Sequence, residues 1–211
     1  MTELVRVAAL SGYIETMAGL GLDPRPLLKE QGLSADLLVN PEQLIPARAA
    51  IRLLERSAAE SGCITLGLRM AEGRALANLG ASSLLIAHQP TLRHALTALQ
   101  EFRARINSTL VLQLEDMGED TVLHEDFTLR RPEPLRQSSD LALGVLMRLC
   151  TEVLGKDWSP RMVCFSHQAP PAAEQPIFAR VFRCPLQFDS ELNGIVLRRI
   201  DLDRPNQRAD D

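Results

Sequence analysis

The chain has 211 residues, of which 45% are hydrophobic, so it can bury a sizeable core and is most simply one domain. Its net charge of -4 excludes an overall basic field that could hold a phosphate backbone. No apolar run approaches the roughly 18 residues needed to cross a bilayer. With four scattered cysteines and no secretory signal pattern, the composition predicts a reduced, cytoplasmic protein without membrane association.

The first half of the chain has the periodicity of helices. Apolar residues recur at spacings of three and four between Leu4 and Met17, which predicts one amphipathic helix there. Three later segments predict helices for the same reason: one beginning at Pro46, one over Ile64 to Gly73 and one over Thr91 to Ile106. Gly67, inside the second of these, would allow a neighbouring element to approach closely.

After Asn107 the apolar period changes from that of a helix to that of a strand. Residues alternate from Leu110 to Leu114 and again from Val122 to Leu129, with turn residues at 118–120 between them. This pattern predicts an antiparallel hairpin. The helical period then returns from Leu135 to Leu154.

The last quarter of the chain predicts short elements that need a larger apolar surface to cover them. We expect a strand over Met162 to Phe165, a helix over Glu174 to Arg183, a brief strand at Leu186 and Phe188, a turn at Asn193-Gly194 and a final strand over Ile195 to Leu197. The predicted class is α+β, with an N-terminal helical layer packed on a small, mostly antiparallel sheet and two further helices.

Sites with the pattern of catalytic or metal centres are scarce. Cys164 and His167, with Cys184 further on, could suggest a metal site, but a spacing of three on a strand sends the two side chains to opposite faces. We therefore expect structural thiols, no metal and no cofactor. The sequence has no glycine-rich phosphate loop, no H-E-x-x-H and no G-x-S-x-G elbow, so we do not expect an enzyme.

Seven segments, in order along the chain and together with the predicted hairpin, carry a resemblance to a known family: G-L-D-P-R-P-L-L-K-E-Q-G-L, L-I-P-A-R, L-G-L-R-M-A, Q-P-T-L-R-H-A-L-T-A-L, V-C-F-S-H-Q-A-P-P, F-R-C-P-L-Q-F-D and L-N-G-I-V-L. Together they resemble the N-terminal effector-sensing, arabinose-binding-like domain of AraC/XylS-type transcription regulators. The resemblance runs from about Leu4 to Leu202. It implies a regulatory domain that binds a small-molecule effector. The alternatives are a stand-alone small-molecule-binding protein or enzyme on a similar fold, and a dimerisation module without an effector.

The chain departs from this family at its C-terminal end. Such regulators continue through a linker into two helix-turn-helix units, whereas this chain ends at D-R-P-N-Q-R-A-D-D. We expect residues 1–202 to form the sensing domain and residues 203–211 to begin the linker, with DNA contacted only through the missing domain. Because these regulators commonly bind paired half-sites, the resemblance also implies a possible homodimer, for which the helices Leu92 to Ile106 and Leu135 to Leu154 are the candidate interface elements.

An effector pocket is expected where the helical layer meets the sheet, with apolar walls and a few polar groups that fix the ligand's orientation. Four polar residues at the ends of helices or strands beside apolar neighbours could point into it. They are Arg103, Asn107, Arg136 and His167. Arg103 or Arg136 could hold a carboxylate by a bidentate contact, and His167 could donate or accept a hydrogen bond.

Overall fold

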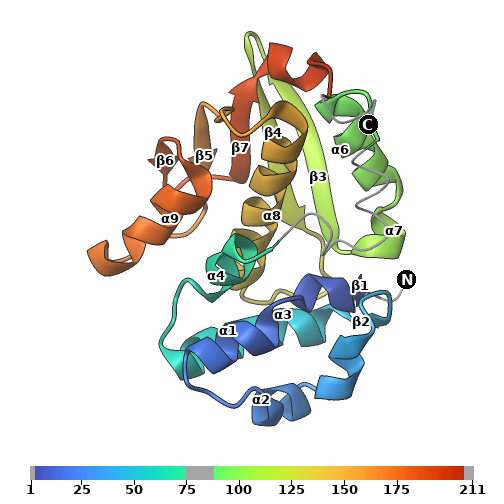
Figure 1. Cartoon of the computed structure of the whole chain (residues 1–211), viewed down its shortest axis with the longest axis vertical. Helices are drawn as coiled ribbons and strands as arrows, with labels where there is room; N and C mark the ends of the chain where they lie inside the picture. The colour runs from blue at the N-terminus through green and yellow to red at the C-terminus, as the bar shows by residue number, and fades with distance from the viewer. Residues whose placement is uncertain (1–2, 75–87, 207–211) are drawn as a thin grey trace.

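The computed structural model of the chain describes residues 3–74 and 88–206 (Figure 1). Short helices make up most of its N-terminal part, and a sheet with longer helices follows. The N-terminal elements, with η for a 3-10 helix, are β1 (Leu4–Arg6), η1 (Val7–Leu10), α1 (Tyr13–Gly19), α2 (Arg25–Glu30), η2 (Ala35–Val39), β2 (Leu44–Pro46), α3 (Ala47–Ser61) and α4 (Leu66–Glu72). The later elements are α6 (Leu92–Glu101), α7 (Arg103–Ile106), β3 (Leu110–Met117), β4 (Asp120–Phe127), α8 (Arg136–Leu154), β5 (Met162–Cys164), η4 (Ala172–Glu174), α9 (Gln175–Phe182), β6 (Leu186–Gln187), β7 (Asn193–Arg198) and η5 (Arg199–Asp203).

The main sheet has five strands in the order β3-β4-β7-β5-β6. Its pairs are antiparallel except for the short parallel pair of β5 and β6. The hairpin of β3 and β4 pairs Met117 with Asp120, so its turn lies where the sequence predicts it. The α+β class and the mostly antiparallel sheet are confirmed.

Helix α8 joins the two halves of the molecule. It contacts β4 and β7 of the sheet as well as α3 and α4 of the N-terminal part. Leu143 and Leu146 belong to the apolar core over the sheet, whereas Leu141 belongs to the core of the N-terminal helices. Arg148 is the only residue of α8 with an exposed side chain. The apolar faces of α8 are thus covered within one chain, which leaves it little surface for a dimer interface; its part in such an interface stays a prediction.

Gly67 lets α4 and α8 approach each other closely, as the sequence predicts. A Cβ atom at this position would lie 2.2 Å from the backbone oxygen of Gln137. The Gly67 N–H also donates a hydrogen bond of 2.9 Å to Gln137 Oε1, whose amide group in turn donates to the Ile64 carbonyl. The absence of a side chain at Gly67 thus places the start of α8 directly on α4.

The single N-terminal helix predicted over Leu4 to Met17 is wrong. Leu4–Arg6 forms strand β1 and pairs with the three residues of β2, and a 3-10 turn follows. Gly12 then takes a φ of +80°, which starts α1 in a new direction. The apolar spacing of this segment suits a helix, but the pairing with β2 satisfies the backbone of β1 in an extended form.

The turn predicted at Asn193-Gly194 is also wrong, because both residues lie inside β7. Gly194 is paired with His124 on one side and with Cys164 on the other. A Cβ atom here would lie 2.8 Å from the Leu123 carbonyl oxygen. The glycine therefore permits close backbone approach within the sheet rather than a change of direction.

Two further features bear on the predicted ends of elements. The helix expected over Thr91 to Ile106 is divided at Phe102 into α6 and α7. Residues 203–206, predicted to begin the linker, are held against the start of α6: Arg93 Nε lies 2.7 Å from Asp203 Oδ1, and the Asn206 N–H donates to the Pro90 carbonyl at 2.8 Å.

Within the described residues, no helix combines the length and apolar character that a bilayer crossing requires.

Candidate functional site

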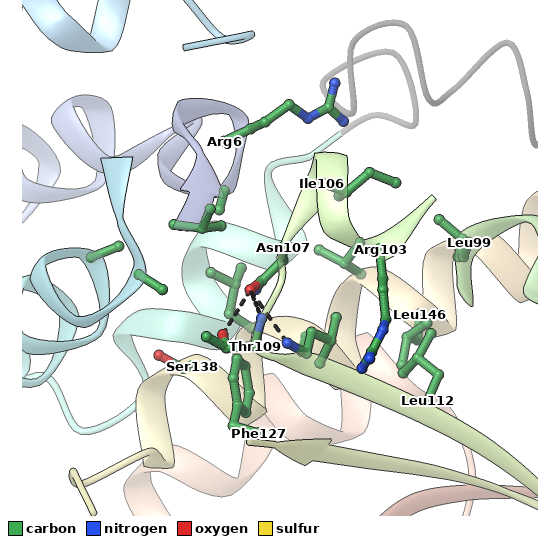
Figure 2. Close-up of a pocket in the computed structure, with 18 of the residues that line it drawn as sticks. Arg6, Leu99, Arg103, Ile106, Asn107, Thr109, Leu112, Phe127, Ser138 and Leu146 are labelled. Carbon is green, nitrogen blue, oxygen red and sulfur yellow. Dashed lines mark hydrogen bonds between the residues drawn. The ribbon is translucent and has the colours of Figure 1, made fainter. Parts of the chain in front are cut away.

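A cavity of about 350 Å³ lies between the N-terminal part and the sheet. Its walls come from β1 and η1, α3, α6 and α7, β3 and one face of α8 (Figure 2). The lining combines alanines on the helices, such as Ala47, Ala50 and Ala142, with larger side chains of β3, such as Leu112. Because an alanine fills little of the space between two layers, the facing side chains leave room for a small molecule.

Polar side chains are few on these walls. They are Arg6, Arg74, Gln100, Arg103, Asn107, Thr109, Gln113 and Ser138. All other lining residues are apolar, and no aspartate or glutamate is among the described residues that line the cavity. An apolar pocket with a few convergent polar groups is typical of a small-molecule site.

Two of the four residues predicted for the pocket, Arg103 and Asn107, line this cavity. Figure 2 shows the Arg103 side chain extending from α7 toward Leu112 and Leu146. Arg103 is largely exposed, and it forms no ion pair or hydrogen bond with the side chains of the described residues. Its guanidinium group is therefore free to meet a ligand at the mouth of the cavity.

Asn107 shapes the turn from α7 into β3. Its Oδ1 atom accepts hydrogen bonds from the Thr109 N–H at 3.1 Å, the Thr109 hydroxyl at 2.7 Å and the Leu110 N–H at 3.3 Å (Figure 2). The carbonyl oxygen of the Asn107 side chain is thus occupied by the protein itself. This residue holds the wall of the cavity in shape.

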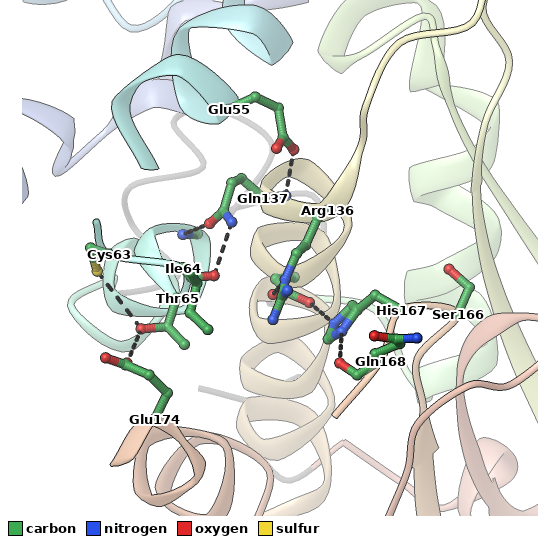
Figure 3. Close-up of polar contacts among 12 residues, drawn as sticks. Glu55, Cys63, Ile64, Thr65, Arg136, Gln137, Ser166, His167, Gln168 and Glu174 are labelled. Atoms are coloured by element: carbon green, nitrogen blue, oxygen red, sulfur yellow. Dashed lines mark hydrogen bonds and ion pairs between the residues drawn. The ribbon is translucent and has the colours of Figure 1, made fainter. Parts of the chain in front are cut away.

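The other two predicted residues, Arg136 and His167, do not line the cavity and instead meet at Asp140 (Figure 3). His167 Nε2 lies 2.9 Å from Asp140 Oδ1, and Arg136 Nε lies 4.0 Å from Asp140 Oδ2. Asp140 and the cavity-lining Ala142 are about 200° apart around α8, because an α-helix has 3.6 residues per turn. Helix α8 thus separates Arg103 and Asn107, at the cavity, from Arg136 and His167, at Asp140.

Asp140 is fully buried. Burial raises the pKa of its carboxyl group, and the hydrogen bond and charge of His167 oppose this shift. The His167 ring packs beside Phe165 and Phe188, with ring centroids 5.3 and 5.6 Å away. The contact between His167 and Asp140 therefore holds the start of α8 against the segment after β5 and stabilises the fold.

The sequence did not single out Arg74, which is a buried cation of the cavity wall, as Arg6 is. Its side chain is 6% exposed, and one guanidinium nitrogen donates to the carbonyls of Ala9 and of Ser11, the latter at 3.0 Å. Burial lowers the pKa of Arg74 to about 10. An arginine directly after Gly73 is usual at a helix end, so only the folded arrangement of α4 beside η1 shows that it is enclosed.

A model of the arabinose-binding domain at the N-terminus of AraC transcription regulators matches residues 21–206. The chain belongs to this family. It is 24% identical over 210 residues to the HTH-type transcriptional regulator VirS of Mycobacterium tuberculosis, found in two strains, and spans 98% of its own length and 61% of that relative. Its fold is similar to the crystal structure of the transcriptional regulator CdpR from Pseudomonas aeruginosa, with a TM-score of 0.62 and 14% identity over 88% of this chain and 56% of that one.

VirS and CdpR are both named as transcriptional regulators, and the chain spans about three fifths of the length of VirS. The family match covers both layers of the fold, and it includes every cavity-lining residue from Ala47 onward.

Proposed function

We propose that this chain is the effector-sensing domain of an AraC-type transcription regulator and that it binds a small, largely apolar molecule in the cavity between α3, α7, α8 and β3. The observation that carries the proposal is the apolar cavity with few polar groups on its walls. The family supports the regulatory role. In a longer regulator, occupancy of this cavity would control a DNA-binding domain, through which alone DNA is contacted.

Within this proposal Arg103 is the ligand-binding residue at the mouth of the cavity, and Asn107 maintains its wall. Arg136 and His167 serve the core around Asp140 instead. A thermal-shift screen of small organic acids and amino acids tests this assignment, since a ligand that binds only the folded state raises its stability by about 2.7 kcal/mol at a hundredfold excess over Kd. We expect Arg103→Ala to reduce the shift produced by a hit, whereas Arg136→Ala and His167→Ala keep it.

The location of the site is tested by filling the cavity. Ala142→Phe places an aromatic ring in the cavity, and Ala104→Phe on the exposed side of α7 is the matched control. Hits should lose their thermal shift with the first variant and keep it with the second. Hits that persist with Ala142→Phe would place the ligand elsewhere. Native mass spectrometry of the purified chain adds a direct search for a retained molecule.

The alternative function is an enzyme or a carrier on the same fold. The described residues that line the cavity include no histidine, cysteine, aspartate or glutamate, which are the usual acid, base and nucleophile groups. This composition favours a sensor. A substrate-turnover screen separates the classes, because a sensor returns its ligand unchanged.

We also propose that the sensing domain dimerises, through the outer side of α6 and α7. With α8 enclosed in the core, these helices are the remaining candidates, and α6 exposes Thr97 and Glu101. Light scattering at tens of micromolar protein tests the proposal. A mass of one chain, 23.3 kDa, counts against it.

A further inference from the structure

The buried cation in the cavity wall indicates the chemical class of the ligand. Three arginines, Arg6, Arg74 and Arg103, line the cavity, and no carboxylate among the described lining residues accompanies them. Arg6 has an acidic partner, because its Nη1 atom lies 2.6 Å from Glu42 Oε2. The charges of Arg74 and Arg103 have none within the described residues.

Of these two charges, that of Arg74 is the more deeply buried. It is 6% exposed, and its Nε atom is buried without a hydrogen-bond partner among the described residues. The segment 75–87, which follows it directly, contains no aspartate or glutamate in its sequence. Two backbone carbonyls satisfy one guanidinium nitrogen, but carbonyl groups carry no net charge to offset the buried cation.

A buried charge without a partner costs several kcal/mol, and an opposite charge placed beside it recovers much of this cost. The effect is largest away from water, where the effective dielectric constant is low. Arg103 is solvated at the mouth of the cavity, so an anion gains less there. The depressed pKa of Arg74 has the same cause, which is burial without a compensating charge.

We propose that the cavity takes an apolar molecule that carries one negatively charged group, and that this group lies against Arg74. The apolar body then occupies the space bounded by alanines of α3 and α8 and leucines of β3, such as Ala50, Ala142 and Leu112. Monocarboxylates with an apolar chain or ring are the matching class. A guanidinium group binds a carboxylate by charge-assisted, often bidentate hydrogen bonds, which are about twice as strong as neutral ones. This inference rests on the proposed function, because it uses the same cavity.

The test compares head groups on a constant apolar body, with the unmodified chain. The probes are octanoate, octanamide and octylamine, and 4-phenylbutyrate with its amide, each titrated by isothermal calorimetry at neutral pH. At least one acid should bind at least tenfold more tightly than its own amide, and the amine should not bind. An amide that binds as tightly as its acid overturns the proposal, and so does the failure of every acid to bind.

Variants then locate the charged group. Arg74→Met should weaken binding of the acid at least tenfold and leave binding of the amide unchanged, whereas Arg103→Met should weaken the acid only two- to threefold. Arg105→Met, on α7 but outside the cavity lining, is the matched control and should change nothing. If Arg74→Met does not fold, Arg103→Met decides the location, because a tenfold or larger loss of acid binding there would place the charged group at Arg103 and overturn the assignment to Arg74.

Failure of this inference is distinguishable from failure of the proposed function. One outcome is that neutral hits bind the unmodified chain more tightly than every acid and lose their binding with Ala142→Phe. That outcome leaves the sensing function in place and refutes the anionic class of ligand. Acid binding that survives Ala142→Phe refutes the cavity as the site, and with it both proposals.

Discussion

His167 and Asp140 form a hydrogen-bonded pair of 2.9 Å between the segment after β5 and the first turns of α8, with the Asp140 side chain wholly enclosed. Removing the histidine leaves a buried carboxylate whose remaining ion-pair partner among the described residues is Arg136, 4.0 Å away. We expect His167→Ala to lower the free energy of unfolding by about 3 kcal/mol, because breaking one side of a buried pair costs that much. Urea denaturation with an unchanged m value measures it.

The control is the double variant of this pair. Asp140→Asn with His167→Gln removes both charges, and it should be more stable than the sum of the two single changes predicts. A loss of less than 0.5 kcal/mol for His167→Ala, as is usual for a surface contact, would show that the pair contributes little.

Gly67, at the contact of α4 with α8, and Gly73, directly after α4, offer a matched comparison. A Cβ at Gly67 would lie 2.2 Å from the Gln137 backbone oxygen, whereas the nearest atom to a Cβ at Gly73 is 3.8 Å away. Gly67→Ala forces two helices apart, and we expect a net loss of about 2 to 3 kcal/mol. Gly73→Ala should be neutral or stabilising by up to about 1 kcal/mol. Thermal or urea unfolding of both variants checks the difference, and equal stabilities would contradict the close contact.

The buried carboxyl group of Glu125 makes the stability of the fold depend on pH. Burial raises the pKa of this carboxyl group from 4.5 to about 8, and the Ser139 hydroxyl only partly opposes the shift. Between these two values the folded chain keeps a proton that the unfolded chain has lost. The contribution of Glu125 is therefore fully present below pH 4.5 and is lost as the pH rises to about 8, by an amount on the order of 4 kcal/mol.

Glu125→Gln removes this titration. Its unfolding free energy should fall less than that of the unmodified chain between pH 5 and pH 8, while the exposed Glu101→Gln follows the unmodified curve. Parallel curves for Glu125→Gln and the unmodified chain would mean that Glu125 is ionised in the folded state at neutral pH.

The isolated chain should not retain duplex DNA. It carries a net charge of -4, and its sequence predicts no recognition helix flanked by basic residues. Gel-shift titration of a promoter fragment at physiological salt checks this expectation. Specific retention by these 211 residues would contradict it.

The sequence predicts the hairpin and α8 well because each has a long, regular period. The period of two in the hairpin and the period of α8 leave little choice of structure. The N-terminal segment fails for the opposite reason: Leu4–Arg6 is short, and its partner β2 is equally short and lies about 40 residues away. Spacing alone cannot reveal such a pairing. At Gly194 the residue type is informative, but a turn and a close backbone contact both favour glycine.

The candidate site shows the same limit. Arg103 and Asn107 reach the cavity because they end a helix whose apolar side faces the core, which periodicity can predict. Arg136 and His167 also lie at the ends of elements beside apolar neighbours, yet they meet on the far side of α8. Arg74 has no local signal at all, because its enclosure depends on η1 folding back over the end of α4. Ligand binding by any of these residues stays a prediction.

The last prediction concerns Asp201 of η5, which accepts hydrogen bonds from Trp158, in the segment before β5, and from Arg198 at the end of β7. Its Oδ2 atom lies 3.0 Å from Trp158 Nε1 and 3.0 Å from Arg198 Nε, and its side chain is 1% exposed. Burial, which raises the pKa, is outweighed by these hydrogen bonds, so the pKa of Asp201 lies below its usual value. Its stabilising effect is thus present at neutral pH and is lost as the pH falls below the unfolded value of 3.8.

Asp201→Ala leaves the buried indole N–H of Trp158 without its acceptor, and we expect a loss of about 2 to 3 kcal/mol at neutral pH. Asp203→Ala is the matched control. Its carboxylate also pairs with an arginine, at 2.7 Å from Arg93, but is 57% exposed, so its removal should cost less than about 1 kcal/mol. Trp158 is the only tryptophan, so its fluorescence reports on this contact directly. The emission maximum should move with Asp201→Ala and stay in place with Asp203→Ala. Equal losses of stability, or an unchanged emission maximum with Asp201→Ala, would show that the indole does not depend on Asp201.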